Sequence, residues 1–160
     1  MSKLTIVCAG KMKETYQKEE VAEFVKRLSK YFVVSISEVP DIKIKENASL
    51  KEEELVIIKE GEALLKKIPN DSYVIALDLH GKEYDSLEFA KKIEKIFLSG
   101  YHHLCFVIGG SLGISKAVLD RANERLCLSK MTFTHLMTRI LVLEQVYRAC
   151  KINNGEKYHK

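Results

Sequence analysis

Residues 104–113 read LCFVIGGSLG, an apolar run that stops at a loop containing three glycines. Five consecutive apolar residues are typical of a strand covered on both faces, as in the middle of a parallel sheet. Gly109, Gly110 and Gly113 follow at once, and their missing Cβ atoms let the backbone approach a ligand closely. Ligands of parallel α/β sheets bind outside the carboxyl ends of the strands. The stretch therefore predicts a buried strand followed by a ligand-binding loop.

The rest of the chain alternates short apolar runs with helical patterns. The predicted strands cover residues 4–8, 32–36, 73–77, 104–108 and 125–128. The predicted helices lie around residues 21–28, 49–65, 85–97, 115–122 and 134–150. Such alternation produces βαβ units, so we expect an α/β fold with a mostly parallel sheet of five to six strands flanked by helices. No linker or repeat divides the chain, which predicts a single domain over residues 1–160.

Two helix starts carry capping signals. Ser49 is followed three residues later by Glu52, the spacing of a capping box. Asp85 precedes the third helical pattern, where an N-cap role is favoured.

The last predicted helix is apolar over a wide surface. One stripe is widened by three further residues; together they are Leu136, Met137, Ile140, Leu141, Leu143, Val146, Tyr147 and Cys150. One sheet face does not cover so much apolar surface. We expect either a second subunit against this helix or a helix buried on two sides.

Composition favours a cytoplasmic protein without metal or membrane segment. Apolar residues make up 46% of the chain, charged residues 30%, and the four cysteines form no CxxC pair. The uncharged run 96–115 contains four glycines and a His pair, which argues against a membrane helix. His102 and His103 point to opposite faces of a strand, so we expect surface or capping roles rather than a shared metal.

Positive charge is concentrated toward the C-terminus. Residues 1–102 hold 17 Lys and Arg against 18 Asp and Glu, whereas residues 103–160 hold 9 against 4. The net charges are therefore −1 and +5. A phosphate-facing surface and a solvated helix face both produce this asymmetry.

Two further loops, DLHGKEY at 78–84 and SKMTFT at 129–134, also follow predicted strands. The glycine loop matches neither the dinucleotide-binding GxGxxG nor the P-loop, but it does match GxSxG, the nucleophile elbow of α/β-hydrolases. Ser111, Asp120 and His135 stand in the order of such a triad. A serine hydrolase is therefore one alternative function, although no oxyanion segment of the HGGG kind is present.

Four segments in this order carry a specific resemblance: FVIGGSLG (106–113), SKMTF (129–133), RILVLEQVYRA (139–149) and GEKYHK (155–160). The chain resembles the bacterial ribosomal RNA large subunit methyltransferase H family, part of the SPOUT class of knotted methyltransferases, over nearly its whole length. The family commonly has Pro where this chain has Thr134. Thr is a competent N-cap, so the helix start is expected to survive.

The resemblance implies a C-terminal trefoil knot, a homodimer, and S-adenosylmethionine bound by loops after three strands. It also implies a substrate, the N3 atom of a pseudouridine in the interface stem-loop of 23S ribosomal RNA, methylated in assembled ribosomes. The cofactor contacts carried to this chain are Leu77, Gly109, Leu128, Ser129, Lys130, Met131, Thr132 and Phe133.

A methyl group on a sulfonium is already reactive, so the protein must mainly align the acceptor nitrogen with it. We expect Arg148, Tyr158 and His159 on the RNA side of a site whose cofactor is held by the other subunit. Arg148 would pair with phosphate, whereas Tyr158 or His159 would assist loss of the imide proton or orient the base. A non-enzymatic ribosome-binding module is a second alternative, because the basic C-terminal part would serve it equally.

Overall fold

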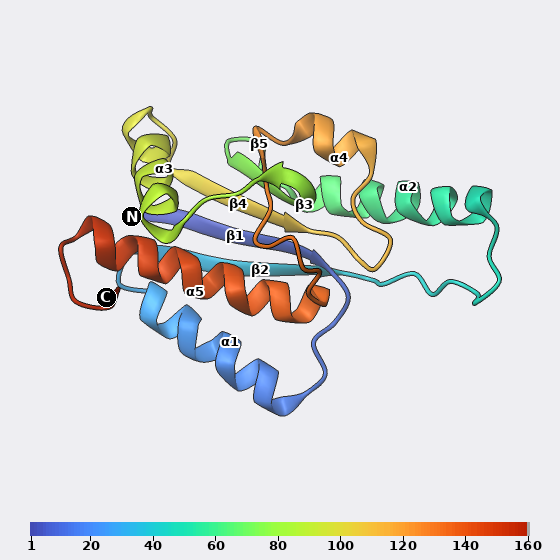
Figure 1. Cartoon of the computed structure of the whole chain (residues 1–160), viewed down its shortest axis with the longest axis horizontal. Coiled ribbons are helices and arrows are strands. Elements are labelled where there is room, and N and C mark those ends of the chain that lie inside the picture. The colour runs from blue at the N-terminus through green and yellow to red at the C-terminus, as the bar shows by residue number, and fades with distance from the viewer. Residues whose placement is uncertain (160) are drawn as a thin grey trace.

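The computed structural model describes residues 1–159, which fold around a single parallel sheet (Figure 1). Lys160, which ends both the predicted 1–160 domain and the GEKYHK segment, lies outside the described residues. The strands are β1 (Ser2–Ala9), β2 (Phe32–Val39), β3 (Tyr73–Lys82), β4 (His103–Ile108) and β5 (Glu124–Leu126). They run in the order β2-β1-β4-β3-β5, and all neighbours pair in parallel. This confirms the predicted α/β class, while the trefoil knot stays a prediction.

Helices cover both faces of the sheet. They are α1 (Thr15–Leu28), α2 (Leu50–Lys67), α3 (Ser86–Leu98), α4 (Lys116–Arg121) and α5 (His135–Asn153). Because strand side chains alternate, Leu4, Ile6 and Cys8 of β1 pack with residues of α1, α3 and α5. Val7 and Ala9 pack on the other face with residues of α2 and α4. The chain therefore forms three layers around two hydrophobic clusters.

The predicted helix starts are confirmed. The Asp85 carboxylate accepts a hydrogen bond from the Glu88 amide at 2.7 Å, and the Glu88 carboxylate accepts one from the Asp85 amide at 2.9 Å. The Ser49 hydroxyl accepts from the Glu52 amide at 3.2 Å and donates to the Glu52 carboxylate. Both pairs satisfy amides that a helix start leaves without partners.

Two predicted boundaries near the third strand and the last strand are wrong. Residues 78–82 belong to β3 rather than to a loop, and residues 127–128 lie outside β5. Leu77 and Lys82 both pair with Leu126, so the segment between them bulges out of the ladder. A Cβ atom on Gly81 would lie 2.7 Å from the Leu126 nitrogen, so the return to β5 needs a glycine. The local apolar pattern does not predict the pairing of Lys82 with Leu126, because it depends on a strand that lies far away in the sequence.

Helix α5 is buried on two sides, the second of the two arrangements expected for its wide apolar surface. It packs against both α1 and α3 as well as the sheet, and Figure 1 shows α1 and α5 side by side. Ile140, Leu143 and Val146 are buried, while Leu141 is half-buried and Met137 is 44% exposed. A homodimer stays a prediction, because the chain itself covers most of this surface.

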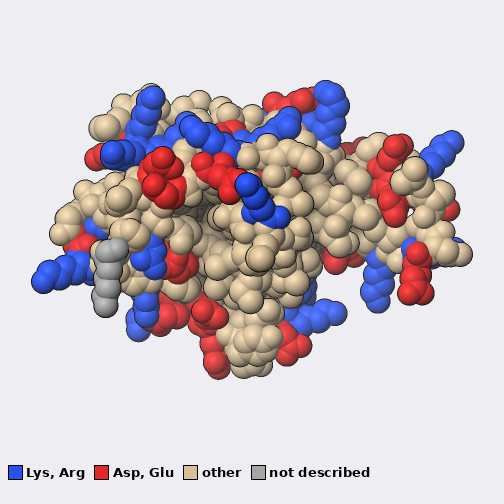
Figure 2. Space-filling model, in the orientation of Figure 1, with Lys and Arg blue, Asp and Glu red and all other residues tan. Residues whose placement is uncertain are grey.

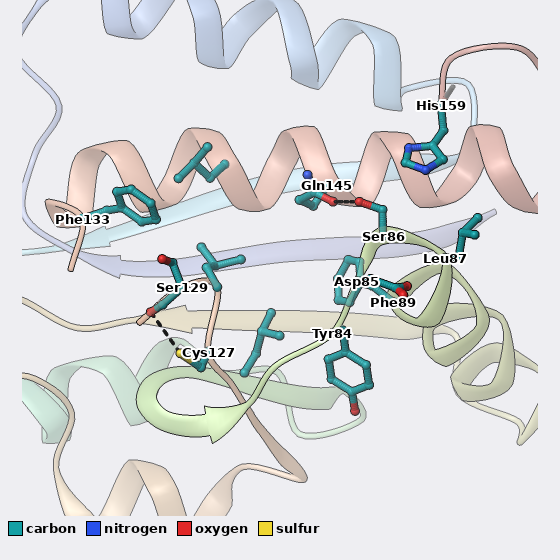
Figure 3. Close-up of a pocket in the computed structure, with 13 residues that line it drawn as sticks. Tyr84, Asp85, Ser86, Leu87, Phe89, Cys127, Ser129, Phe133, Gln145 and His159 are labelled. Atoms are coloured by element: carbon teal, nitrogen blue, oxygen red, sulfur yellow. Dashed lines mark hydrogen bonds between the residues drawn. The ribbon is translucent and has the colours of Figure 1, made fainter. Parts of the chain in front are cut away.

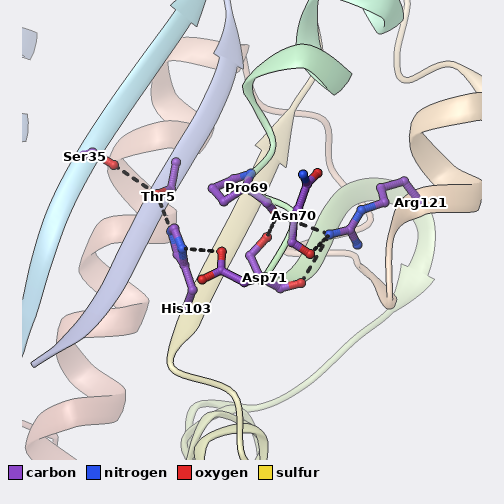
Figure 4. Close-up of polar contacts among 8 residues, drawn as sticks. Thr5, Ser35, Pro69, Asn70, Asp71, His103 and Arg121 are labelled. Atoms are coloured by element: carbon purple, nitrogen blue, oxygen red, sulfur yellow. Dashed lines mark hydrogen bonds and ion pairs between the residues drawn. The ribbon is translucent and has the colours of Figure 1, made fainter.

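The expected surface or capping role is wrong for His103, which is buried in β4 (Figure 4). Its Nε2 atom lies 2.7 Å from the Thr5 hydroxyl, and its Nδ1 atom lies 3.4 Å from the Asp71 carboxylate. Thr5 also contacts the Ser35 hydroxyl at 2.9 Å. β4 lies between β1 and β3 and is covered on both faces, so a residue at its start is enclosed, whereas His102 before it is exposed.

Candidate functional site

A cavity of about 1050 Å³ opens at the carboxyl ends of β3, β4 and β5. Its walls come from residues 77–80, the glycine loop 108–114, residues 125–129 and 131–136, and the start of α1. These three strands are neighbours in the sheet, so their loops converge at one edge. A cavity therefore lies where the sequence predicts the ligand site.

The glycine loop is tightly turned against this cavity. The Gly113 amide donates to the Gly110 carbonyl at 3.1 Å, and Gly113 has a φ of +93°, which favours glycine. A Cβ atom on Gly109 would lie 2.8 Å from both the Gly113 oxygen and the Ile114 side chain. The loop closes only because Gly109 has no side chain.

The segment after β5 is held by local hydrogen bonds. The Cys127 amide donates to the Lys82 carbonyl at 3.0 Å, and the Met131 amide donates to the Ser129 hydroxyl at 3.0 Å. The Thr134 hydroxyl accepts from the Met137 amide at 3.2 Å and caps α5. The expected survival of the helix start with Thr134 is confirmed.

The predicted cofactor-binding residues converge on this cavity with one exception. Leu77, Gly109, Leu128, Ser129, Met131, Thr132 and Phe133 all line it. Lys130 is exposed and does not line it. Three of the lining side chains are also exposed apolar groups: Leu79 at 55%, Met131 at 76% and Phe133 at 39%.

The three predicted RNA-side residues lie together at the end of α5. The Arg148 guanidinium lies 4.7 Å from the centre of the Tyr158 ring, and its Nη1 atom lies 3.2 Å from His159 Nδ1. Glu144 joins them: its Oε1 atom accepts from Arg148 Nη2 at 2.5 Å and from the Tyr158 hydroxyl at 3.1 Å. Sequence reasoning missed Glu144, although its spacing of four from Arg148 is that of a helical ion pair.

A second pocket of about 580 Å³ lies between the cavity and this cluster (Figure 3). Leu126, Cys127, Leu128, Ser129 and Phe133 line both pockets. Figure 3 shows Phe133 and His159 at opposite ends, with Ser86 and Gln145 between them in a 3.2 Å hydrogen bond. Arg148 and Tyr158 line neither pocket, and none of the three RNA-side residues lines the larger cavity.

Burial also determines which groups near the site hold their protons. Burial, followed by the neighbouring Glu144 carboxylate, raises the pKa of Tyr158, so its hydroxyl is a hydrogen-bond donor at neutral pH. Burial raises the pKa of Cys8 to about 11 and that of Cys150 to about 12. Both thiols therefore stay protonated and unreactive.

The structure does not assemble the serine hydrolase triad. Ser111 is exposed, and the Asp120 carboxylate lies 2.7 Å from the Lys116 ammonium. Among residues 1–159, no hydrogen bond joins Ser111 to His135 or to Asp120. The hydrolase alternative lacks its geometry.

Much of the positive charge of the C-terminal part is neutralised within the chain. The ion pairs are Lys116–Asp120, Arg125–Asp78, Arg139–Glu38, Arg148–Glu144 and Lys151–Glu156. On the face shown in Figure 2, Lys and Arg alternate with Asp and Glu. Lys130 and Lys157 are exposed and have no ion pair with another described residue. The uneven distribution of charge along the sequence therefore produces only a modest basic surface.

Within the described part of the chain, no group of three or more His, Cys, Asp and Glu side chains is placed to hold a metal ion. None of the helices among residues 1–159 is long and apolar enough to cross a bilayer.

The fold and the cavity define an α/β protein with a ligand-sized cavity at one edge of its parallel sheet, between β3, β4 and β5. A family model described as "Predicted SPOUT methyltransferase" matches residues 2–159. Curated relatives named "Ribosomal RNA large subunit methyltransferase H" are similar over 157 residues, at 98% of this chain and 99% of each relative. They include proteins of Clostridium acetobutylicum (52% identical), Clostridioides difficile strain 630 (52%) and Clostridium botulinum strain 657 (53%). The chain therefore belongs to the SPOUT methyltransferases, in the ribosomal RNA large subunit methyltransferase H family.

Proposed function

We propose that this protein transfers a methyl group from S-adenosylmethionine to the N3 atom of a pseudouridine in the interface stem-loop of 23S ribosomal RNA, in assembled ribosomes. The carrying observation is the cavity at the carboxyl ends of β3, β4 and β5, lined by all the predicted cofactor-binding residues except Lys130. The names of the relatives, which specify methylation of large-subunit ribosomal RNA, support the same substrate class.

The residues of the cavity fit this cofactor. Its volume of about 1050 Å³ is ample for a nucleoside with an amino-acid tail. Leu77, Leu128 and Phe133 offer apolar surface to a flat ring. Gly109 adds backbone without a Cβ atom to the cavity wall, and a Cβ atom there would collide with Gly113 and Ile114 of the same loop. When bound, S-adenosylmethionine supplies a methyl group that needs no further activation.

The chain's own task is to present the acceptor base. Transfer requires that N3 give its proton to a base, for which His159 is the other candidate of the cluster, and attack the methyl carbon as the carbon–sulfur bond on the opposite side breaks and its electron pair stays on sulfur. The raised pKa of Tyr158 keeps its hydroxyl protonated, and Glu144 accepts that one proton in a hydrogen bond, so we assign Tyr158 to orienting the base through its ring and hydroxyl oxygen rather than to removing the proton. Arg148 is held by Glu144 and stacks on Tyr158, which pre-organises the group expected to meet the RNA.

The active site is composite and needs a homodimer. Arg148, Tyr158 and His159 do not line the larger cavity of their own chain, which supports a site in which a second copy brings its cluster to the cofactor. The exposed Leu79, Met131 and Phe133 at the rim of the cavity are apolar surface that such a partner would cover.

Selectivity comes from the ribosome. Phosphate contacts position a protein without reading sequence, and most basic residues of the C-terminal part already have acidic partners in the chain. An assembled ribosome presents one stem-loop with its base accessible, which lowers the few kcal/mol needed to unstack it. Free ribosomal RNA is then a poor substrate.

The test is to incubate the protein with isotopically labelled S-adenosylmethionine and either ribosomes or protein-free ribosomal RNA, and to locate the methylated nucleotide by mass spectrometry. We expect one labelled pseudouridine, and only from ribosomes. Equal transfer to free RNA would reject the ribosome requirement. Ribosome binding without transfer would instead favour the non-enzymatic module.

A further inference from the structure

Glu60 is a buried carboxylate in contact with the glycine loop, although it lies on α2, which does not line the cavity. Its side chain is 6% exposed, and its Oε1 atom accepts a hydrogen bond from the Gly110 amide at 2.8 Å. A buried carboxylate is destabilising unless hydrogen bonds compensate the loss of hydration. Glu60 lines neither pocket, and the apolar and capping pattern of α2 gives no reason for a carboxylate at this position.

Glu60 and Gly61 of α2 both pack closely against the segment that contains the glycine loop. A Cβ atom on Gly110 would lie 2.9 Å from Glu60 Oε2 and 3.3 Å from Asp41 Oδ1. A Cβ atom on Gly61 would lie 2.2 Å from the Ser115 hydroxyl, at the cap of α4. Two successive residues of α2 therefore support the two ends of the segment 110–115.

We propose that Glu60 is a positioning residue that holds the glycine loop in its cofactor-binding shape and thereby determines the affinity for S-adenosylmethionine. The inference rests on the proposed function. The single hydrogen bond fixes Gly110, the neighbour of Gly109, whose backbone faces the cavity. A hydrogen bond to an ionised acceptor is about twice as strong as a neutral one, so the charge of Glu60 matters to the loop.

The charge of Glu60 gives the affinity a pH dependence. Burial raises its pKa, the Gly110 amide opposes that rise, Asp41 adds to it, and His135 opposes it. As pH falls through this raised pKa, the carboxylate becomes a neutral, weaker acceptor. Cofactor affinity therefore falls with acidification from a pH above the ordinary Glu value of about 4.3.

The experiment compares Glu60→Leu and Glu60→Gln with Glu62→Gln, an exposed carboxylate on the same helix. Isothermal calorimetry with S-adenosylmethionine between pH 5 and 8 should show about tenfold weaker binding for Glu60→Leu, the usual loss for a charged hydrogen bond. Glu60→Gln keeps a neutral acceptor, so it should bind a few-fold more weakly and lose the pH slope. Glu62→Gln should match the wild type.

Hydrogen–deuterium exchange of residues 109–115, measured without cofactor, separates this inference from the proposed function. Faster exchange in Glu60→Leu supports loop positioning even if the wild-type protein binds no S-adenosylmethionine, a result that would reject only the proposed cofactor. Unchanged exchange and affinity in Glu60→Leu would overturn the inference. If that variant does not fold, Glu60→Gln decides: a wild-type pH slope would also overturn it.

Discussion

Arg139 is a fully buried cation next to the candidate site, and its partners lie far away in sequence. Its Nη1 atom lies 2.6 Å from Glu38 Oε2, and its Nη2 atom donates to the Gly10 carbonyl at 3.2 Å. Glu38 also accepts from the Met12 amide at 2.9 Å. These contacts tie α5 to the ends of β1 and β2, at the edge of the sheet where the cavity opens.

Glu38→Gln should lower the free energy of unfolding by about 3 kcal/mol at pH 7, because it leaves the Arg139 charge buried without its carboxylate. We take the lower end of the usual range because the Glu38 side chain is 35% exposed. Chemical denaturation followed by circular dichroism measures the loss. Glu23→Gln, which breaks the exposed Glu23–Arg27 pair, is the matched control and should cost less than about 1 kcal/mol.

The same pair has a defined pH dependence. Burial acts to raise the pKa of Glu38, but the Met12 amide and Arg139 outweigh it and lower the pKa below its ordinary value. The stability from a lowered carboxylate pKa is present above the ordinary value of about 4.3 and is lost as pH falls through the folded-state pKa. The difference between wild type and Glu38→Gln should therefore shrink on acidification; a constant difference down to pH 2 would contradict this cause.

Gly109→Val should weaken S-adenosylmethionine binding about 10- to 100-fold. The added side chain overpacks the loop, and the usual cost of about one to three kcal/mol destabilises the loop conformation that binds the cofactor. The added Cβ atom would meet the Gly113 oxygen at 2.8 Å. Calorimetry in the presence of a chelator tests this, and the chelator should not change wild-type affinity. Ala117→Val, at an exposed position of α4, is the control. Unchanged binding by Gly109→Val would remove the loop from the cofactor site.

At the scale of elements, the C-terminal tail is packed rather than frayed over the described residues. The Tyr31 hydroxyl donates to Glu156 at 2.9 Å, and the Tyr158 ring lies edge-on to Tyr147 at 5.0 Å. The Glu156 amide donates to the Lys151 carbonyl at 2.9 Å. The tail is thus an extension of α5 that presents the Arg148 cluster.

Deleting residues 158–160 should abolish methyl transfer while cofactor affinity stays within about twofold of wild type, because the two described residues of this segment, Tyr158 and His159, do not line the larger cavity. Calorimetry and single-turnover transfer to ribosomes separate the two quantities. Tyr158→Phe keeps the ring and removes the donor, so it should lower transfer about 10- to 100-fold. Tyr16→Phe, at a 66% exposed tyrosine of α1, is its control. Full transfer by the truncated protein would show that the tail has no part in the reaction.

At the scale of the whole molecule, the proposed composite site predicts a homodimer. Light scattering at micromolar concentration should report about twice the chain mass of 18.3 kDa. Replacing Phe133, a rim residue that is 39% exposed, with Asp should shift this mass toward that of the monomer. A stable and active monomer would contradict both the dimer and the composite site.

Mixed dimers test which subunit supplies which half. A Gly109→Val chain combined with a chain lacking residues 158–160 leaves one intact cofactor loop and one intact tail in each heterodimer. If the halves come from different subunits, an equal mixture should recover about a quarter of wild-type transfer. No recovery, despite heterodimers detected by native mass spectrometry, would place both halves in one subunit.

The sequence by itself determined the local elements and the loops that matter. The apolar run before Gly109 predicts β4, the caps at Ser49 and Asp85 predict α2 and α3, and alternation predicts the parallel sheet. These signals are local, because apolar periodicity and capping act within a few residues of the chain. The resemblance added the cofactor contacts, which the cavity brings together apart from Lys130.

Only the tertiary structure decided which groups meet across the sheet. The return of β3 onto Leu126, the burial of His103 and the hold of Glu60 on Gly110 each join residues far apart in sequence. The same is true of two ion pairs of the basic C-terminal part, Arg139–Glu38 and Arg125–Asp78. The order of the strands and the packing of the helices determine which distant residues meet. Apolar periodicity along the chain does not encode that order or that packing, because both depend on contacts between elements that are far apart in sequence.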